Sequence, residues 1–377
     1  MQKLTDVAII GGGVVGCFLA YRLALEGVTV TMVEREHLGA GASGASAGNV
    51  QPGEYEPIEG AERLNPLEVE SLALHRRFLP MIKEDSGVDP LDHAVTYFYA
   101  ALTEAEAAHA RRFAATLQRV GLRSEWIDGA AARGLEPRLA PEVLGGAVHH
   151  DCVQMDAQRF VEALGKAAQR RGATLRHGEV VGLRRDGARV TGVRFKDGTV
   201  LEGATVVLAM GAWTAPALSR WLGIAMPIEP HSLQKIHVRP AGSPPACAVR
   251  WGGVNIVGRL DGLVHVGSKH DHTGFEAFPS ADGKQWLVER LRTILPGLAA
   301  TVVEAKAGLA ATLPGRIPML GPVQGFDGLY VAVPSSNGFL LSAVLAHILT
   351  DWLVHGKEHP FMAMISPARV MQSAVAR

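Results

Sequence analysis

Three glycines near the start of the chain have the spacing of a phosphate-binding turn. Gly11, Gly13 and Gly16 follow the apolar residues 7–10 in the pattern G-x-G-x-x-G. Between a buried strand and a helix, the first glycine permits the sharp turn and the second lets the backbone approach a pyrophosphate. The third lets the helix, expected over residues 14–26, pack on the strand and direct its positive dipole end at the phosphates. The expected contacts are Gly11, Gly13, Val14, Val15 and Gly16.

An acidic residue follows where a ribose-binding carboxylate is expected. A second apolar strand, residues 28–33, ends in Glu34, and Arg35 comes next. In dinucleotide sites, an acid about 20 residues after the glycines binds a ribose hydroxyl. Strand, turn, helix, strand and acid together predict a dinucleotide site. The alternative is a glycine-rich turn in another α/β fold.

A run of very small residues follows this acid. Residues 39–49 read Gly-Ala-Gly-Ala-Ser-Gly-Ala-Ser-Ala-Gly-Asn. Such a run could be a flexible linker. Its position directly after the ribose acid favours a ligand-binding loop, because small side chains let backbone N–H groups approach a flat ring. The expected contacts in this loop are Ala42, Ser43, Ala47, Gly48 and Asn49.

From this loop onward the chain resembles the D-amino-acid-oxidase-like superfamily of FAD-dependent oxidoreductases. The resemblance covers almost the whole chain and continues through residues 155–160, 172–175, 204–213, 308–321 and 329–340. It implies that the cofactor is FAD rather than NAD, and that the small-residue loop passes the isoalloxazine. It also implies an adenine contact at Val180 and a second dinucleotide-proximal strand ending at Gly211. The N-terminus of a C-terminal helix, which would stabilise reduced flavin, is placed at Asn337, Gly338, Phe339 and Leu340.

The expected fold class is α/β with mixed α+β character, in two parts. Segments 1–82, 151–222 and 310–365 are expected to form a Rossmann-like FAD-binding domain. Segments 83–150 and 223–309 are expected to form a mixed-sheet substrate domain that caps the flavin. A length of 377 residues favours two such units over a single core. Asp197-Gly198 between alternating strands predicts a hairpin turn.

The bulk composition narrows the function classes. The 37 basic and 37 acidic residues balance, which argues against a nucleic-acid surface. No run reaches the roughly 18 uninterrupted apolar residues of a membrane span, and the first strand begins too early for a signal peptide. Three separated cysteines predict reduced thiols in a cytoplasmic protein. His270 and His272 flank an aspartate, but a third ligand is lacking, so no metal is expected.

The chain departs from the family where an amino-acid substrate would be held. In amino-acid-oxidising relatives, an arginine in a G-x-R-P stretch binds the substrate carboxylate in a bidentate fashion. Here Ala310 and Ala311 occupy the arginine and proline positions, and Gly315-Arg316 replaces an Asp-Gly turn. A closing Gly-His becomes Val333-Pro334, and a pocket tyrosine becomes Asn255. These changes spare the FAD contacts and remove the family's carboxylate anchor.

Other side chains could replace that anchor. The first candidates are Arg250 and His231, which lie on strands of the expected capping domain near the family's substrate residues. Arg259, His270 and Arg316 rank lower, and Arg316 is expected to lie in solvent at a turn. Two tyrosines that alternate along one strand could also face the pocket. The full set of expected substrate-pocket residues is Arg250, His231, Asn255, Tyr97 and Tyr99.

The resemblance implies oxidation of the C–N bond of an amino acid or secondary amine by hydride transfer to flavin N5. D-amino acids, hydroxyprolines and opines are the expected substrate class, because the lost arginine disfavours glycine and sarcosine. A dedicated catalytic base is not required. The alternatives are a 2-hydroxy-acid dehydrogenase and a flavin-bearing subunit of a hetero-oligomeric dehydrogenase that is inactive alone. The electron acceptor would be O2 or a partner subunit.

Overall fold

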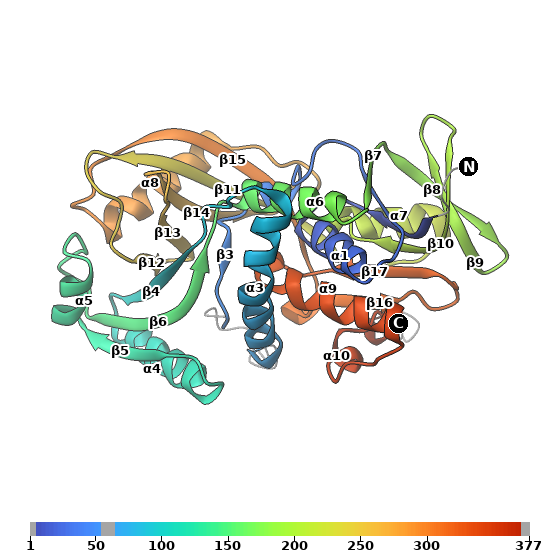
Figure 1. The fold of residues 1–377 in the computed structure, drawn as a ribbon. Helices are drawn as coiled ribbons and strands as arrows, with labels where there is room; N and C mark the ends of the chain where they lie inside the picture. Colours follow the sequence, from blue (N-terminus) through green and yellow to red (C-terminus); the bar gives the residue numbers. More distant parts are fainter. Residues whose placement is uncertain (1–4, 54–64, 371–377) are drawn as a thin grey trace.

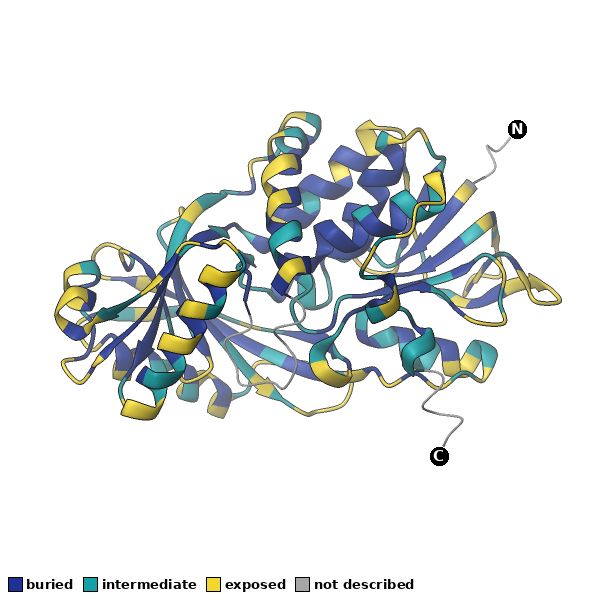
Figure 2. Ribbon diagram, turned by 90° about the horizontal axis from the view of Figure 1, so that it is seen from below, coloured by how far each residue is buried: buried dark blue, intermediate teal, exposed yellow. Residues whose placement is uncertain are grey.

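The structure is a computed structural model that describes residues 5–53 and 65–370. Two mixed sheets lie toward opposite ends of the molecule, with long helices between them (Figure 1). Strands and central helices are buried, whereas exposed residues gather in the outer loops and on outward helix faces (Figure 2). This is the α/β class with mixed α+β character that the sequence predicts.

The first sheet has a parallel centre. Its strands are β1 (Thr5–Ile10), β2 (Val30–Glu34), β7 (Thr174–His177), β8 (Val180–Asp186), β9 (Arg189–Phe195), β10 (Val200–Leu208), β16 (Met319–Pro322) and β17 (Leu329–Val333). The order is β16-β17-β10-β1-β2-β7, and only β16 pairs antiparallel along this path. The predicted hairpin is confirmed, since β9 and β10 pair antiparallel on either side of Asp197-Gly198.

Both faces of this sheet are covered, which explains the unbroken apolar run before the glycine turn. Val7 and Ile9 of β1 pack in one apolar cluster with the central helices. Ala8 and Ile10 point to the other face and pack with residues of β8 to β10. Parallel strands buried on both faces have this composition.

Helices cover the first sheet and fill the middle of the molecule. They are α1 (Val14–Leu25), α2 (Ala42–Ala45), α3 (Asn65–Ser86), α6 (Ala157–Arg170), α7 (Thr214–Leu222), α9 (Gly338–His355) and α10 (Met362–Ile365), with short 3-10 turns η2 (Gly211–Trp213) and η3 (Pro314–Arg316). Helices α1, α3, α6 and α9 pack against one another. Phe18 of α1 is fully buried and meets Phe78 and Phe160 edge to face. These contacts hold the first half of α1 against α3 and α6.

The second sheet is larger and contains mostly antiparallel pairs. Its strands are β3 (Asn49–Val50), β4 (His93–Ala101), β5 (Ser124–Asp128), β6 (Gly145–Gln154), β11 (Glu229–Pro240), β12 (Ala248–Trp251), β13 (Val254–Gly258), β14 (Val264–Asp271) and β15 (Ala300–Thr312). Helices α4 (Glu104–Arg119), α5 (Gly129–Leu135) and α8 (Ala281–Ile294) accompany it. Helix α4 begins with a capping box between Thr103 and Glu106. The order β15-β11-β14-β13-β12-β4-β6-β3 places β12, β13 and β14 in the middle of the sheet.

The predicted domain boundaries remain a prediction. Strand β3 pairs with β6 in the second sheet, although residues 1–82 were assigned to the FAD-binding part. The ends of β6 and β15 also extend past the expected limits at residues 150 and 309. Each crossing is at most a few residues long, and those of β3 and β15 include residues that line the cavity between the sheets.

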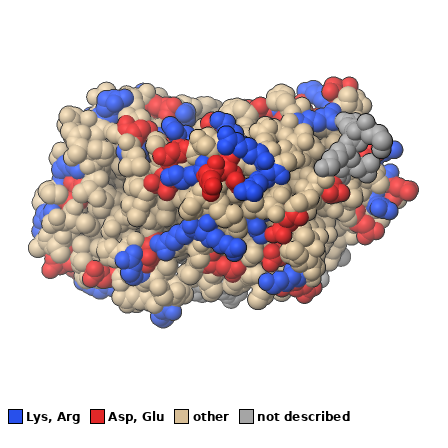
Figure 3. Space-filling model, viewed as in Figure 1, with Lys and Arg blue, Asp and Glu red and all other residues tan. Residues whose placement is uncertain are grey.

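Helix α9 is long and apolar enough to cross a membrane by length and composition. However, 61% of it is buried inside the protein, where it packs against α1 and α3. This is the environment of a core helix in a soluble protein. On the face in Figure 3, lysine and arginine are interspersed with aspartate and glutamate, in keeping with the balanced charge of the chain.

Candidate active site

A cavity of about 1210 Å³ is lined by residues from both sheets. The first sheet contributes the glycine turn, the end of β2 and the start of β8. The second sheet contributes residues of β11 to β15. The volume exceeds the range of roughly 300–1,000 Å³ typical of small-molecule sites, so it suits a large cofactor together with a substrate.

The glycine turn forms one wall of this cavity. Gly11, Gly13, Val14 and Val15 line it. Gly11 has a φ of +113°, and a Cβ there would lie 2.5 Å from the Ala209 carbonyl oxygen. The Val14 N–H donates to Ser43 Oγ at 3.0 Å, which joins the small-residue loop to the first turn of α1. Bare backbone beside a helix N-terminus fits the pyrophosphate of FAD.

Glu34 and Arg35 lie at the end of β2 and line the cavity. Glu34 Oε2 accepts from the Gly12 N–H at 2.7 Å, and Oε1 accepts from the Glu36 N–H at 2.9 Å. The Arg35 guanidinium lies over the Trp213 ring, 4.7 Å from its centroid. These backbone bonds hold the Glu34 carboxylate beside the glycine turn, where it fits a ribose hydroxyl.

Glu34→Ala is expected to raise the Kd for FAD about 10- to 100-fold, because hydrogen bonds to a charged group contribute roughly 1.5–3 kcal/mol. Titrating apoprotein with FAD and following flavin fluorescence measures this. Glu34→Gln keeps the size of the side chain and separates loss of charge from loss of volume. A Glu34→Ala protein that purifies with its full flavin content would show that the ribose contact is assigned to the wrong residue.

Most other expected cofactor contacts also line the cavity. The lining includes Ala42, Ser43, Ala47, Asn49, Val180, Gly211, Asn337, Gly338 and Phe339. Helix α9 begins at Gly338 after Asn337, as predicted, so its N-terminus meets the cavity. Ser46, Gln51 and Ser336 line it as well. The sequence reasoning missed these three, although each is adjacent to or near an expected contact.

Three expected cofactor contacts lie outside the lining. A Cβ at Gly16 would lie 2.0 Å from the Gly11 carbonyl oxygen, so this glycine permits close packing inside the turn. A Cβ at Gly48 would lie 2.0 Å from the Met155 carbonyl oxygen. Leu340 is fully buried, and its carbonyl accepts from the Ser71 hydroxyl and His75 Nε2. These residues support the cavity wall from behind.

Arg250 and Asn255 are brought together in the substrate part of the cavity. They are paired in register on β12 and β13, and both line the cavity. Arg250 Nη1 donates to Asn255 Oδ1 at 3.1 Å. The Asn255 amide therefore orients the guanidinium of Arg250, one of the two first candidates for the carboxylate anchor.

Tyr97 and Tyr99 differ from the expectation, because both are fully buried and neither lines the cavity. Tyr99 packs against Phe113 of α4, with ring centroids 4.6 Å apart. Its hydroxyl accepts from the Gln51 side-chain amide, and Gln51 does line the cavity. The tyrosines therefore form a layer beneath the residues that a substrate would meet.

His231 also lies behind the wall rather than in it. It is 4% exposed and stacks on His270, with ring centroids 5.3 Å apart. The Thr312 hydroxyl lies 2.6 Å from His231 Nδ1. Strand register places His231 directly opposite Ala310, the position of the missing family arginine. His270, His272, Ala310 and Arg316 line the cavity. Arg316, which was expected in solvent at a turn, is half-buried at this wall.

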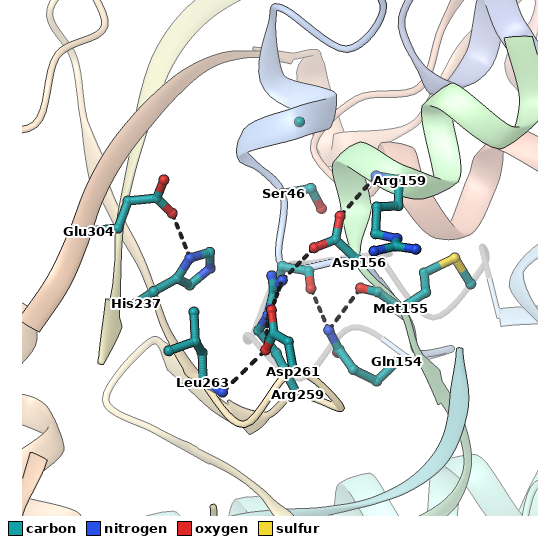
Figure 4. A network of polar contacts seen from close by, with 12 residues as sticks. Ser46, Gln154, Met155, Asp156, Arg159, His237, Arg259, Asp261, Leu263 and Glu304 are labelled. Atoms are coloured by element: carbon teal, nitrogen blue, oxygen red, sulfur yellow. Dashed lines mark hydrogen bonds and ion pairs between the residues drawn. The ribbon is translucent and has the colours of Figure 1, made fainter. Parts of the chain in front are cut away.

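Arg259 belongs to an ion-pair group outside the lining. Its guanidinium pairs with Asp156 at the start of α6 and with Asp261 (Figure 4). Lys269, which the sequence reasoning missed, lines the cavity and pairs with Asp271. In the described part of the chain, no three or more His, Cys, Asp or Glu residues are grouped to hold a metal ion.

Charge is distributed unevenly along the cavity. The acidic lining residues Glu34, Glu36 and Glu179 all come from the first sheet and its loops, together with Arg35 and Arg220. The lining from the second sheet and η3 contains Arg250, Lys269, His270, His272 and Arg316. The described residues of this second part contribute no carboxylate to the lining. This end therefore suits an anionic group of a substrate.

Buried histidines predict a loss of stability in acid. Burial lowers the pKa of His75, His149, His231 and His237 to about 4, from an ordinary value of 6.5. Between these values the unfolded chain binds more protons than the native one, so stability falls as the pH is lowered from about 6.5 toward 4. The Tm of the apoprotein should therefore drop between pH 7 and pH 5 at constant ionic strength. A flat or rising profile over this range would contradict the burial of these imidazoles as neutral rings.

Comparison with known proteins places this geometry in a family. The model of the family described as FAD dependent oxidoreductase, DAO, matches residues 6–352. Glycine oxidase from Pseudomonas putida is 32% identical over 356 residues, which cover 92% of this chain and 94% of that protein. D-amino acid dehydrogenase from Methylobacterium nodulans is 27% identical over 425 aligned positions, which cover 98% of this chain and 100% of that protein.

The fold agrees with a solved relative. The crystal structure of glycine oxidase from Geobacillus kaustophilus superposes with a TM-score of 0.90 at 29% identity, covering 97% of this chain and 98% of that one. The cofactor of this family is FAD, and the glycine turn, Glu34 and the small-residue loop fit it. The chain belongs to the DAO family of FAD-dependent oxidoreductases and is an enzyme that acts on an amino acid or amine C–N bond.

Proposed function

We propose that this enzyme oxidises the C–N bond of an amine that carries a carboxylate, with Arg250 as the carboxylate anchor. The observation that carries the proposal is the cationic lining of the second-sheet part of the cavity, where Ala310 stands in place of the family arginine. Arg250 is oriented by Asn255, and both line the cavity. A guanidinium held in this way matches a carboxylate in a bidentate fashion.

The chain's own residues would position the substrate. Arg250 binds the carboxylate and Asn255 fixes the guanidinium plane. FAD, when bound, accepts the hydride that leaves the substrate carbon. The N-terminus of α9 at Asn337 and Gly338 lines the cavity and stabilises negative charge there. Positioning and this field account for catalysis without a dedicated base.

The substrate class follows from the same wall. Ala310 and Ala311 leave space where the family has an arginine and a proline, and His270 and Arg316 line the cavity on that side. We infer a substrate bulkier than glycine or sarcosine: a D-amino acid, a hydroxyproline or an opine. The electron acceptor is O2 or a partner subunit, and the proposed location is the cytoplasm.

An anaerobic absorbance titration of the purified holoenzyme tests the function. D-amino acids, hydroxyprolines, opines and 2-hydroxy acids are added in turn, and the flavin band near roughly 450 nm is followed. Bleaching by one amine class supports the proposal and identifies the class. Bleaching by 2-hydroxy acids alone would replace it with alcohol oxidation. Flavin that dithionite reduces but no amine reduces would indicate a subunit that requires its partner.

A further inference from the structure

We propose that Lys235 is a positioning residue that fixes the peptides of the small-residue loop at the cavity wall and sets the electrostatic environment of bound FAD. Lys235 lies on β11, is 3% exposed and does not line the cavity. Its Nζ donates to the Ser46 carbonyl at 3.0 Å and to the Gly44 carbonyl at 3.4 Å. A buried ammonium therefore contacts, from behind, the loop that lines the cofactor cavity.

These contacts orient the loop. In a trans peptide the C=O and N–H bonds point in opposite directions. Because the Ser46 carbonyl is directed at Lys235, the Ala47 N–H of the same peptide is directed away from Lys235. Ser46 and Ala47 both line the cavity. Lys235 therefore fixes the side of this peptide that a bound cofactor meets.

Neighbouring contacts hold the same loop to the second sheet. Gln154 Nε2 donates to the Ala47 carbonyl at 2.6 Å, and Arg259 pairs with Asp156 close by (Figure 4). A register shift between β11 and β14 occurs between Gln234 and Lys235. Such bulges re-aim side chains. Hydrogen bonds from Gln154 of β6 and Lys235 of β11 thus hold the loop, and of these two side chains only Lys235 carries a charge.

The charge of Lys235 is balanced by carbonyl dipoles. Among the described residues Lys235 forms no ion pair, and its ammonium donates hydrogen bonds to the Gly44 and Ser46 carbonyls. Glu304 of β15 instead forms an ion pair with Lys306 and accepts a hydrogen bond from the neutral His237 ring. Burial, with Lys306 and Arg259 adding repulsion, lowers the pKa of Lys235 to about 8, while Glu304 and Asp156 oppose this. His265 of β14, whose pKa is lowered by burial and by Lys235, packs nearby and is neutral.

A buried, unpaired ammonium costs folding stability, so packing alone does not account for a lysine at this position. A positive charge behind the loop favours negative charge on the reduced cofactor. Lys235 should therefore raise the flavin midpoint potential. Negative charge on a reduced cofactor at this wall would raise the pKa of Lys235, so reduction above about pH 8 would take up an additional proton.

The test compares Lys235→Met, Lys235→Arg and the exposed control Lys284→Met. We expect Lys235→Met to raise the Kd for FAD at least about tenfold. Its midpoint potential should fall by about 30 mV or more, which is a tenfold change in the two-electron equilibrium. The apoprotein Tm should be unchanged or higher, because a buried charge is removed. Lys235→Arg should restore part of the FAD affinity and part of the midpoint potential. Lys284→Met should match the wild type in both.

A second measurement does not depend on the variant folding. The wild-type midpoint potential should fall with pH more steeply above about pH 8, by about 30 mV per pH unit. Lys235→Met should lack this break. A wild-type profile without a break would overturn the proposal, as would Lys235→Met with wild-type FAD affinity and potential, or with losses only in proportion to a lowered apoprotein Tm. Because chemical reduction needs no substrate, the result is independent of the proposed amine substrate.

Discussion

Replacing Arg250 with alanine is expected to raise the KM for the carboxylate-bearing substrate about 10- to 100-fold. Charged hydrogen bonds of the kind that Arg250 would make contribute roughly 1.5–3 kcal/mol, and each 1.4 kcal/mol is a factor of ten. The limiting rate of flavin reduction should change less, because the anchor binds the ground state and the transition state alike. Anaerobic stopped-flow reduction at varied substrate concentration separates the two quantities.

Two matched variants sharpen this prediction. Arg250→Lys keeps the charge but loses the bidentate fork, so it should recover only part of the affinity. Arg292→Ala removes an exposed arginine of α8 that does not line the cavity, and it should leave KM unchanged. Arg250→Ala with wild-type kinetics would remove Arg250 from the substrate site. Arg316, which also lines the cavity, would then be the next arginine to replace.

Replacing Gly48 with alanine is expected to destabilise the apoprotein by about 3 kcal/mol or more. Gly48 has a φ of +79°, which costs other residues roughly 1–3 kcal/mol. An added Cβ would also lie 2.0 Å from the Met155 carbonyl oxygen, so backbone would have to move. For a chain of 377 residues the Tm should fall by at least about 4 °C. Differential scanning calorimetry of the flavin-free protein measures it.

Two other glycines separate the backbone strain of a positive φ from the steric clash of an added Cβ. Gly223 has a φ of +71° with no atom within 4 Å of an added Cβ, so Gly223→Ala isolates the backbone cost. Gly242 has neither feature, and Gly242→Ala should leave the Tm close to that of the wild type. A Gly48→Ala apoprotein as stable as the Gly242→Ala protein, but unable to bind FAD, would make Gly48 a cofactor contact after all. The close approach of an added Cβ to the Met155 carbonyl would then not be what requires glycine at this position.

The cofactor wall was largely predictable because its signals are local. The turn, the start of α1 and the position of Glu34 depend on residues within one strand–turn–helix–strand unit, where glycine spacing and apolar runs dictate backbone conformation. The helical spacing of apolar residues in α9 is local in the same sense, whereas the family resemblance indicated its start near Asn337 and Gly338. The family resemblance added contacts such as Val180, which no local rule would place beside the cavity.

The substrate wall depended on tertiary structure. Register between β11 and β15 places His231 opposite Ala310, and stacking on His270 keeps His231 behind the lining. Packing against α4 and Gln51 buries Tyr99, although strand alternation alone allowed it to face a ligand. Arg316 of η3 lines the cavity, which the spacing of residues in the sequence does not specify.

The sequence by itself therefore determined the fold class and the glycine turn, helix and acid of the cofactor wall, since short-range backbone geometry encodes them, and the family resemblance identified the cofactor as FAD. Only the tertiary structure decided which basic side chains line the cavity and that Lys235 lies behind the small-residue loop. Those facts depend on strand register and on which neighbours cover a side chain. Both arise from contacts between residues far apart in the chain, which residue spacing does not specify.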